Sequence, residues 1–173
     1  MHSFTLKVYI FCKLFVHLLM ALVEIKTNKK IKVKIVPVEE DDYKLLTKKR
    51  YYFSWKPFKN RRGVLVYKLQ ISGDDDILGV MALIEVPDES RIKIDLLACS
   101  KENVGKSKAY DGITGHLIAD ACRQAVKQYG GDACVSLVPK TRLKSHYIRK
   151  YGMLDAGWQL FLEGKALNNI ILK

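Results

Sequence analysis

Residues 106–128 read KSKAYDGITGHLIADACRQAVKQ, a glycine-bearing turn that runs directly into an amphipathic helix. The turn carries two lysines, Lys106 and Lys108, and two glycines, Gly112 and Gly115. The first N–H groups of a helix have no acceptor within it, and the helix dipole makes this end positive. Together with the two lysines, these groups predict a binding site for a phosphate or diphosphate.

The segments on either side of the turn complete a strand–loop–helix unit. The run IKIDLLACS, residues 92–100, is predicted to be a strand. Apolar residues then recur at helical spacing from Ile113 to Val126, which predicts a helix over residues 110–129 that ends at Gly130 and Gly131. Nucleotide-type cofactors favour this order of elements.

The rest of the chain predicts a mixed α+β domain. Further strands are expected at residues 31–38, 61–71, 77–86, 89–100, 133–139 and 157–164, helices at 39–53 and 141–153, and a short closing segment at 166–173. Three successive strands with short links predict an antiparallel meander. The helix that follows it must cross back over the sheet, so the strand at 133–139 should lie parallel to the last strand of the meander.

Composition limits the possible partners and the compartment. The 173 residues include 30 Lys and Arg against 18 Asp and Glu, a net charge of +12. This balance favours a polyanionic partner, such as RNA or another nucleic acid, an anionic membrane surface, an acidic partner or a phosphorylated ligand, and ordinary solubilising charge is the alternative. The four cysteines form no CxxC pair and have no metal-ligand spacing. We therefore expect a protein of the reducing cytoplasm with neither a disulfide nor a bound metal.

The N-terminus is unusually apolar. Residues 8–23 are shorter than the roughly 20 residues of a membrane span. Lys13 interrupts them, and no convincing signal-peptide cleavage site follows. A membrane-surface helix and an extension that precedes a start at Met20 are the remaining alternatives. We therefore expect an N-terminal extension at 1–23, which would contact a membrane only if it is exposed, and a domain at 24–173.

From residue 31 onward the sequence resembles the GNAT superfamily of N-acetyltransferases. In that family a strand and a glycine-containing loop lead into a long helix that binds the diphosphate of acetyl-coenzyme A; IKIDLLACS and YDGITGHLIADAC correspond to these parts. ACVSLVP resembles the fifth strand, SHYIRKYGM the tyrosine-bearing helix, and GWQLFLEG the final strands. The loop departs from the usual motif at Ala109 and Thr114. The resemblance implies a single-domain, GNAT-like acyl-CoA N-acyltransferase fold with a mostly antiparallel central sheet flanked by helices.

The resemblance also implies an activity and a set of site residues. The activity is transfer of an acetyl group from acetyl-CoA, a co-substrate, to a primary amine by direct attack in a ternary complex. Tyr147 is the expected proton donor, with Tyr151 as the alternative. The implied coenzyme-binding residues are Leu97, Ala98, Cys99, Lys106, Lys108, Tyr110, Gly112, Ile113, Thr114 and Gly115.

The general base and the acceptor stay open. Asp95 is the candidate base, and a solvated strand residue is its alternative role. Regular strand alternation would place Ile94 and Leu96 together on the face opposite Asp95. A second function is compatible with the same residues: a non-catalytic GNAT-like module that binds coenzyme A, RNA or a protein partner through its basic surface. The oligomeric state is not determined by the sequence.

Overall fold

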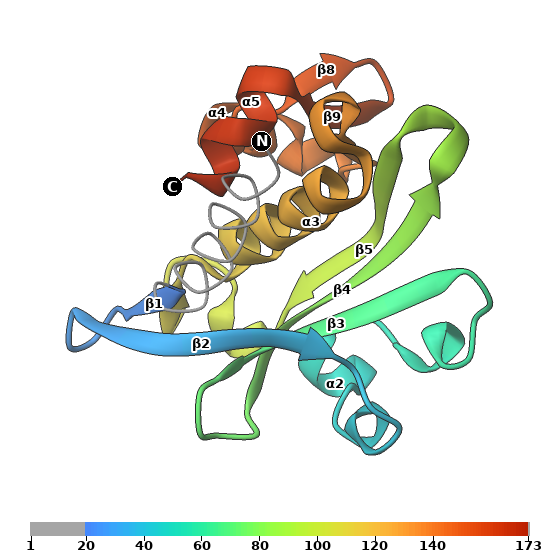
Figure 1. Cartoon of the computed structure of the whole chain (residues 1–173). Helices are drawn as coiled ribbons and strands as arrows, with labels where there is room; N and C mark the ends of the chain where they lie inside the picture. Colours follow the sequence, from blue (N-terminus) through green and yellow to red (C-terminus); the bar gives the residue numbers. More distant parts are fainter. Residues whose placement is uncertain (1–19, 173) are drawn as a thin grey trace, which may run out of the picture.

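The computed structural model describes residues 20–172 and contains one nine-stranded, mostly antiparallel sheet with helices on both faces (Figure 1). The strand order across the sheet is β6-β1-β2-β3-β4-β5-β7-β9-β8. The strands are β1 (Ala21–Glu24), β2 (Lys29–Pro37), β3 (Val64–Ile71), β4 (Ile77–Val86), β5 (Arg91–Cys99), β6 (Tyr110–Asp111), β7 (Cys134–Leu137), β8 (Leu154–Ala156) and β9 (Gln159–Glu163). The α-helices are α2 (Lys48–Tyr51), α3 (Ile113–Tyr129), α4 (Lys144–Tyr151) and α5 (Gly164–Ile171).

The antiparallel meander and the parallel crossover confirm the expected topology. Strands β3, β4 and β5 pair in sequence order, and β7 pairs with β5 in parallel. Helix α3 supplies the crossover between them. No helix among residues 20–172 is long and apolar enough to cross a membrane.

The helix expected at residues 39–53 is wrong. Two short pieces replace it, a 3-10 turn at Asp41–Lys44 and the single-turn helix α2. Thr47 is extended and Tyr52 is left-handed, so the chain changes direction on both sides of α2. The bend lets two large aromatic side chains, Tyr51 and Trp55, reach the same buried cluster, and this burial outweighs the weak preference for one continuous helix.

Three short strands, β1, β6 and β8, have no counterpart in the sequence-based expectation. Strand β1 begins at Ala21, three residues before the expected domain start at 24, and Leu22 is fully buried. His116 holds β1 against α3, because its Nε2 lies 3.1 Å from the Ala21 carbonyl oxygen. Most of the expected N-terminal extension, residues 1–19, lies outside the described residues.

Two apolar clusters cover the two faces of the sheet. Helices α3, α4 and α5 lie on one face and α2 lies on the other (Figure 1). The first cluster combines Ile92 and Ile94 of β5 with the inner side of α3. The second combines Leu96 and Ala98 of β5 with Tyr51, Trp55 and their neighbours. Strand β5 therefore contributes to both clusters.

A β-bulge at Asp95 explains how one strand serves both clusters. Ala82 of β4 pairs with Leu96 and Leu83 pairs with Ile94, so Asp95 is the extra residue. Before the bulge the even-numbered side chains face α3, and after it Leu97 and Cys99 do. The expectation that Ile94 and Leu96 share a face is therefore wrong, because regular alternation ends at the bulge.

Helix α3 approaches the sheet very closely at its first turn. Gly79 of β4 lies under this turn, and a Cβ atom placed on it would be 2.5 Å from Cγ2 of Ile113. Only a residue without a side chain fits there without displacing the helix. Gly79 pairs with Cys99 at the end of β5, so this glycine fixes the height of the α3 N-terminus above the strand.

Candidate functional site

The N-terminus of α3 presents free N–H groups at the end of β5. Gly112 caps the helix with φ of 99°, and no side chain caps it. The first helical bond of α3 runs from the His116 N–H to the Gly112 carbonyl, 3.0 Å. The N–H groups of Ile113, Thr114 and Gly115 precede that bond and are directed along the helix axis. The glycine turn and the helix N-terminus of the expected anion site therefore lie together at the end of β5, and anion binding there stays a prediction.

Two ammonium groups and one carboxylate surround this helix end. Asp111 accepts the Gly112 N–H at 2.9 Å, and its carboxylate lies 2.6 Å from Lys108 Nζ and 3.5 Å from Lys150 Nζ. The Lys108 hydrogen bond lowers the pKa of Asp111, and the Lys150 charge acts in the same direction. The local charge is still positive, because two cations face one anion. Lys150 comes from α4, and no local sequence pattern could have placed it here.

The loop between β5 and α3 is built around the buried side chain of Asn103. The Tyr110 N–H donates to Asn103 Oδ1 at 3.0 Å, and Asn103 Nδ2 donates to Ser100 Oγ at 2.9 Å. Tyr110 itself pairs with Glu24 of β1. Lys106 lies exposed on the loop. The structure thus brings Lys108 to the helix end, whereas Lys106 reaches solvent.

Strands β5 and β7 separate beside this helix end. Their parallel pairing stops at Ile94 and Leu137, where β7 ends, while β5 continues to Cys99. The Ser100 N–H donates to the Leu78 carbonyl of β4, 2.9 Å. By alternation, the main-chain groups of Leu97 and Cys99 point the other way, into the opening between β5 and β7. Those of Ala98 point toward β4, and its side chain joins the α2-side cluster.

Two buried tyrosines of α4 line the same opening. The ring centroids of Tyr147 and Tyr151 are 5.7 Å apart, and the exposed His146 packs edge-on against both. A Cβ atom on Gly115 would lie 3.4 Å from Tyr151 Cε1, so the absent side chain lets this ring approach α3. Thr114 Oγ1 lies 3.3 Å from Cys99 Sγ. Tyr147, Cys99, Thr114 and Gly115 are thus brought together as expected, and Tyr151 joins them.

Burial keeps these groups protonated. It raises the pKa of Tyr147 to about 12, and the nearby Cys99 adds to the shift. Burial likewise raises the pKa of Tyr151, with contributions from Tyr147 and Cys99 that the Thr114 hydroxyl partly offsets. Burial also raises the pKa of the Cys99 thiol. At neutral pH the cluster therefore offers hydroxyl protons and no anion.

Alkaline pH should destabilise the protein through Tyr147. The folded state holds this proton more tightly than the unfolded chain does, so the contribution is complete below about pH 10 and is lost as the pH rises to about 12. The full shift is worth about 3 kcal/mol of unfolding free energy. Urea unfolding between pH 9 and 12 should show this loss, and Tyr147→Phe should make the loss less steep. An equally steep loss in the variant would contradict the assignment.

Asp95 lies at the bulge and does not join the tyrosine cluster. Its carboxylate is 3.0 Å from Arg61 Nη1 and 2.8 Å from Lys93 Nζ. Burial raises its pKa, but the hydrogen bond and charge of Lys93, together with Arg61, outweigh burial and lower the pKa below the usual value. A carboxylate held by two cations is a weak proton acceptor.

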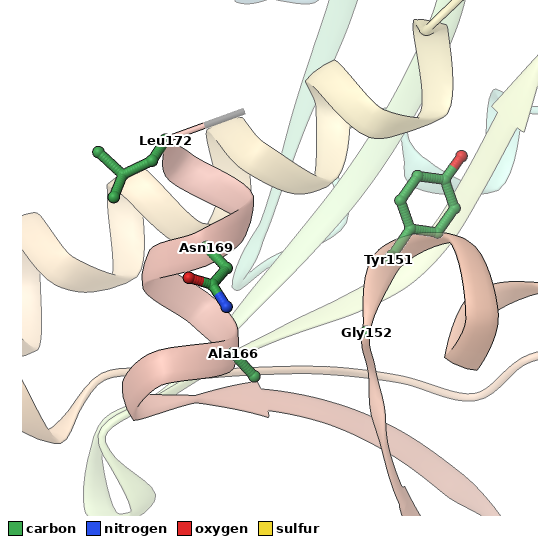
Figure 2. A pocket seen from close by; sticks show the side chains of 5 residues that line it. All are labelled: Tyr151, Gly152, Ala166, Asn169 and Leu172. Atoms are coloured by element: carbon green, nitrogen blue, oxygen red, sulfur yellow. The ribbon is translucent and has the colours of Figure 1, made fainter.

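A hollow of about 340 Å³ adjoins Tyr151 on the side of α5. Figure 2 shows it between the end of α4 and α5, and it is lined by Tyr151, Gly152, Ala166, Asn169 and Leu172. Tyr151 is therefore shared between this hollow and the first turn of α3. Sequence reasoning missed the hollow because helix α5 was expected only as a closing segment. Among residues 20–172, no group of three or more His, Cys, Asp or Glu side chains could hold a metal ion.

Comparison with known proteins gives structural neighbours only. No family model matches the sequence, and no curated protein matches it either. Among solved structures, a chimera of the spermidine N-acetyltransferase SpeG from Vibrio cholerae and hSSAT superposes with a TM-score of 0.59 at 12% identity, covering 79% of this chain and 98% of that one. Mutant forms of the Vibrio cholerae spermidine/spermine N-acetyltransferase give 0.58 at 11% identity, covering 79% and 96%. The dodecameric spermidine N-acetyltransferase from Vibrio cholerae in an intermediate state gives 0.56 at 11% identity, covering 76% and 93%. The expected fold class is confirmed.

Proposed function

We propose that this chain, whose fold is that of the GNAT N-acetyltransferases, transfers an acetyl group from acetyl-CoA to a primary amine. The observation that carries the proposal is the opening between β5 and β7, which leads from two buried tyrosines to an uncapped helix N-terminus. The structural neighbours are N-acetyltransferases, which supports the same class of activity.

The residues at the end of α3 fit the coenzyme diphosphate. The N–H groups of Ile113, Thr114 and Gly115 would hold its oxygens, as helix N-termini commonly do. Lys108 and Lys150 would balance its charge, because both ammonium groups lie at this helix end, beside the Asp111 carboxylate. The hollow beside Tyr151 provides room for a further part of the coenzyme.

The strand edge and Tyr147 would act on the reacting end. When bound, acetyl-CoA supplies an activated acyl group on a thiol leaving group. The main-chain groups of Leu97 and Cys99 would pair with the amides of its arm and stabilise negative charge that develops on the thioester oxygen. The Tyr147 hydroxyl, protonated across the physiological range, would donate to the departing sulfur.

Asp95 has a more limited part in this proposal. Its lowered pKa makes it a poor base, so the acceptor would lose its proton to water, or arrive neutral. The carboxylate can still attract and orient an approaching amine at the bulge. A non-catalytic module is the second candidate, and it is favoured by the lowered pKa of Asp95, the carboxylate that the sequence offered as the general base.

Gly112→Val should weaken coenzyme binding. The residue has φ of 99°, which costs a β-branched side chain about 1–3 kcal/mol, so the turn would rearrange and misdirect the N–H groups. Titration calorimetry with coenzyme A should show at least about tenfold lower affinity.

Gly63→Val, at another positive φ with open space around it, is the matched control for strain alone. Wild-type protein that fails to bind coenzyme A would end the enzyme proposal. Binding without acetylation of any amine, measured with labelled acetyl-CoA, would leave the non-catalytic module.

A further inference from the structure

Residues 48–62, called here the basic segment, read KKRYYFSWKPFKNRR and run from α2 to the start of β3. The segment has no acidic residue. Its cationic residues are Lys48, Lys49, Arg50, Lys56, Lys59, Arg61 and Arg62. Aromatic residues alternate with them: Tyr51, Tyr52, Phe53, Trp55 and Phe58. Tyr51 and Trp55 are fully buried in the second apolar cluster. Tyr52 is exposed, and Phe53 and Phe58 are half-buried against the same cluster.

Three contacts place the basic segment across the end of the opening between β5 and β7. Lys101, just beyond β5, lies 4.6 Å from the Tyr52 ring centroid. Lys140, in the loop after β7, lies 4.5 Å from the Phe53 ring centroid. Arg61 reaches the bulge of β5 through Asp95. The segment therefore meets both strands that border the proposed acyl-transfer site, on the face opposite α3.

The surface at this position stays positively charged after its own ion pairs are counted. Within residues 20–172, acidic partners engage Arg50, Lys59 and Arg61 of the segment. The exposed side chains of Lys48, Lys49, Lys56 and Arg62 form no ion pair there. Lys101 and Lys140 add two more cations from neighbouring loops. Such a surface repels a polycation such as spermidine, after which the structurally similar N-acetyltransferases are named, and attracts a polyanion.

The aromatic side chains favour a nucleic acid over an acidic peptide. Tyr52 is 55% exposed and takes up the left-handed conformation, φ of 63°, that few bulky residues adopt. Phe53 and Phe58 are half-buried. Cations interleaved with exposed rings provide both phosphate contacts and stacking surfaces, which is how proteins hold single strands. An acidic peptide would use the charges but leave the exposed Tyr52 ring without a stacking partner.

We propose that the basic segment binds single-stranded RNA and that the acceptor is a primary amine carried on that RNA. The proposal rests on the proposed acetyltransferase function. It assigns the coenzyme to the α3 face of the opening and the acceptor to the α2 face, so that the amine meets the acyl group at the bulge of β5.

The first test measures binding of a mixed-sequence single-stranded RNA oligonucleotide as a function of salt. The segment variant combines Lys48→Gln, Lys49→Gln, Lys56→Gln and Arg62→Gln, all exposed positions. The control variant combines Lys26→Gln, Lys30→Gln, Lys127→Gln and Lys165→Gln, which removes the same charge from exposed positions elsewhere. Each phosphate contact contributes about −0.7 to the slope of log affinity against log salt.

The segment variant should therefore lose about 3 units of slope, and the control variant should keep the wild-type slope. Equal slopes in the two variants would overturn the proposal, and so would an acidic peptide that binds more tightly than the RNA. Tyr52→Ala should lower the affinity without a change in slope, because it removes stacking and no charge.

The second test compares three acetyl acceptors: an RNA oligonucleotide with a terminal primary amine, the same amine on an uncharged linker, and spermidine. Wild-type protein should prefer the RNA-borne amine, and the segment variant should lose at least about tenfold of that preference. Acetylation with a preference for spermidine or the uncharged amine would overturn this inference and leave the acetyltransferase proposal standing. Absence of transfer to every amine would end both.

Discussion

Tyr147→Phe should lower the turnover number by about 10²–10⁴-fold, the usual range for loss of a positioned proton donor. The coenzyme affinity should hardly change, because in the proposed mechanism the removed hydroxyl donates to the departing sulfur and not to the diphosphate. The substitution keeps the aromatic ring of Tyr147, a residue that is 9% exposed in the folded protein, so the packing of α4 should survive. Steady-state rates with the best available amine and calorimetry with coenzyme A measure the two quantities separately.

Tyr151→Phe provides the matched control on the same helix. Tyr151 lies against Gly115 at the diphosphate end of the opening, so its hydroxyl is expected to matter less for turnover than that of Tyr147. An undiminished turnover number in Tyr147→Phe would remove this residue from the mechanism. A large loss in Tyr151→Phe alone would transfer the role to Tyr151.

Gly79→Ala should destabilise the protein and weaken coenzyme binding together. The new Cβ would lie 2.5 Å from Ile113 Cγ2 and 3.1 Å from Leu117 Cδ1, so the first turn of α3 must move away from the sheet. Overpacking of this kind costs about 1–3 kcal/mol. Thermal unfolding should show a lower midpoint, and calorimetry should show weaker binding of coenzyme A.

Gly131→Ala controls for the change of glycine to alanine. A Cβ atom at Gly131 meets nothing within 4 Å, so this variant should unfold at the wild-type temperature and bind coenzyme A normally. A Gly79→Ala protein with wild-type stability would show that α3 tolerates displacement, and the close fit at Gly79 would lose its proposed importance for the site.

The sequence predicted the elements whose hydrophobic pattern is long and regular. Strand β4 occupies the expected residues, and α3 starts only three residues after its expected start at 110. The failures have local causes. Residues 39–53 have the charge pattern of a helix, but the chain bends there so that Tyr51 and Trp55 are buried, and no continuous helix forms. The short strands β1, β6 and β8 are stabilised by their neighbours in the sheet, and so few residues give no periodic signal.

The candidate site likewise contains parts that the sequence predicted and parts that it did not. The strand ending at Cys99 and the turn at Gly112 are joined by a single loop, so their proximity was predictable. Lys150 and the α5 side of the hollow reach the site through tertiary packing, which leaves no mark on the spacing of residues. The bulge at Asp95 was equally hidden, because an acidic residue between apolar neighbours fits both a regular strand and an irregular one.

The bulge also makes Asp95 the one residue of β5 that the pairing with β4 does not use. Without Asp95, Ile94 would be followed directly by Leu96, and these two side chains already face opposite sides of the sheet, so every other side chain of the strand would keep its present face. Loss of this one residue would remove the carboxylate while Leu97 and Cys99 keep their pairing register. Acceptor preference can therefore diverge among descendants of this chain at position 95, while the coenzyme side of the strand stays as it is.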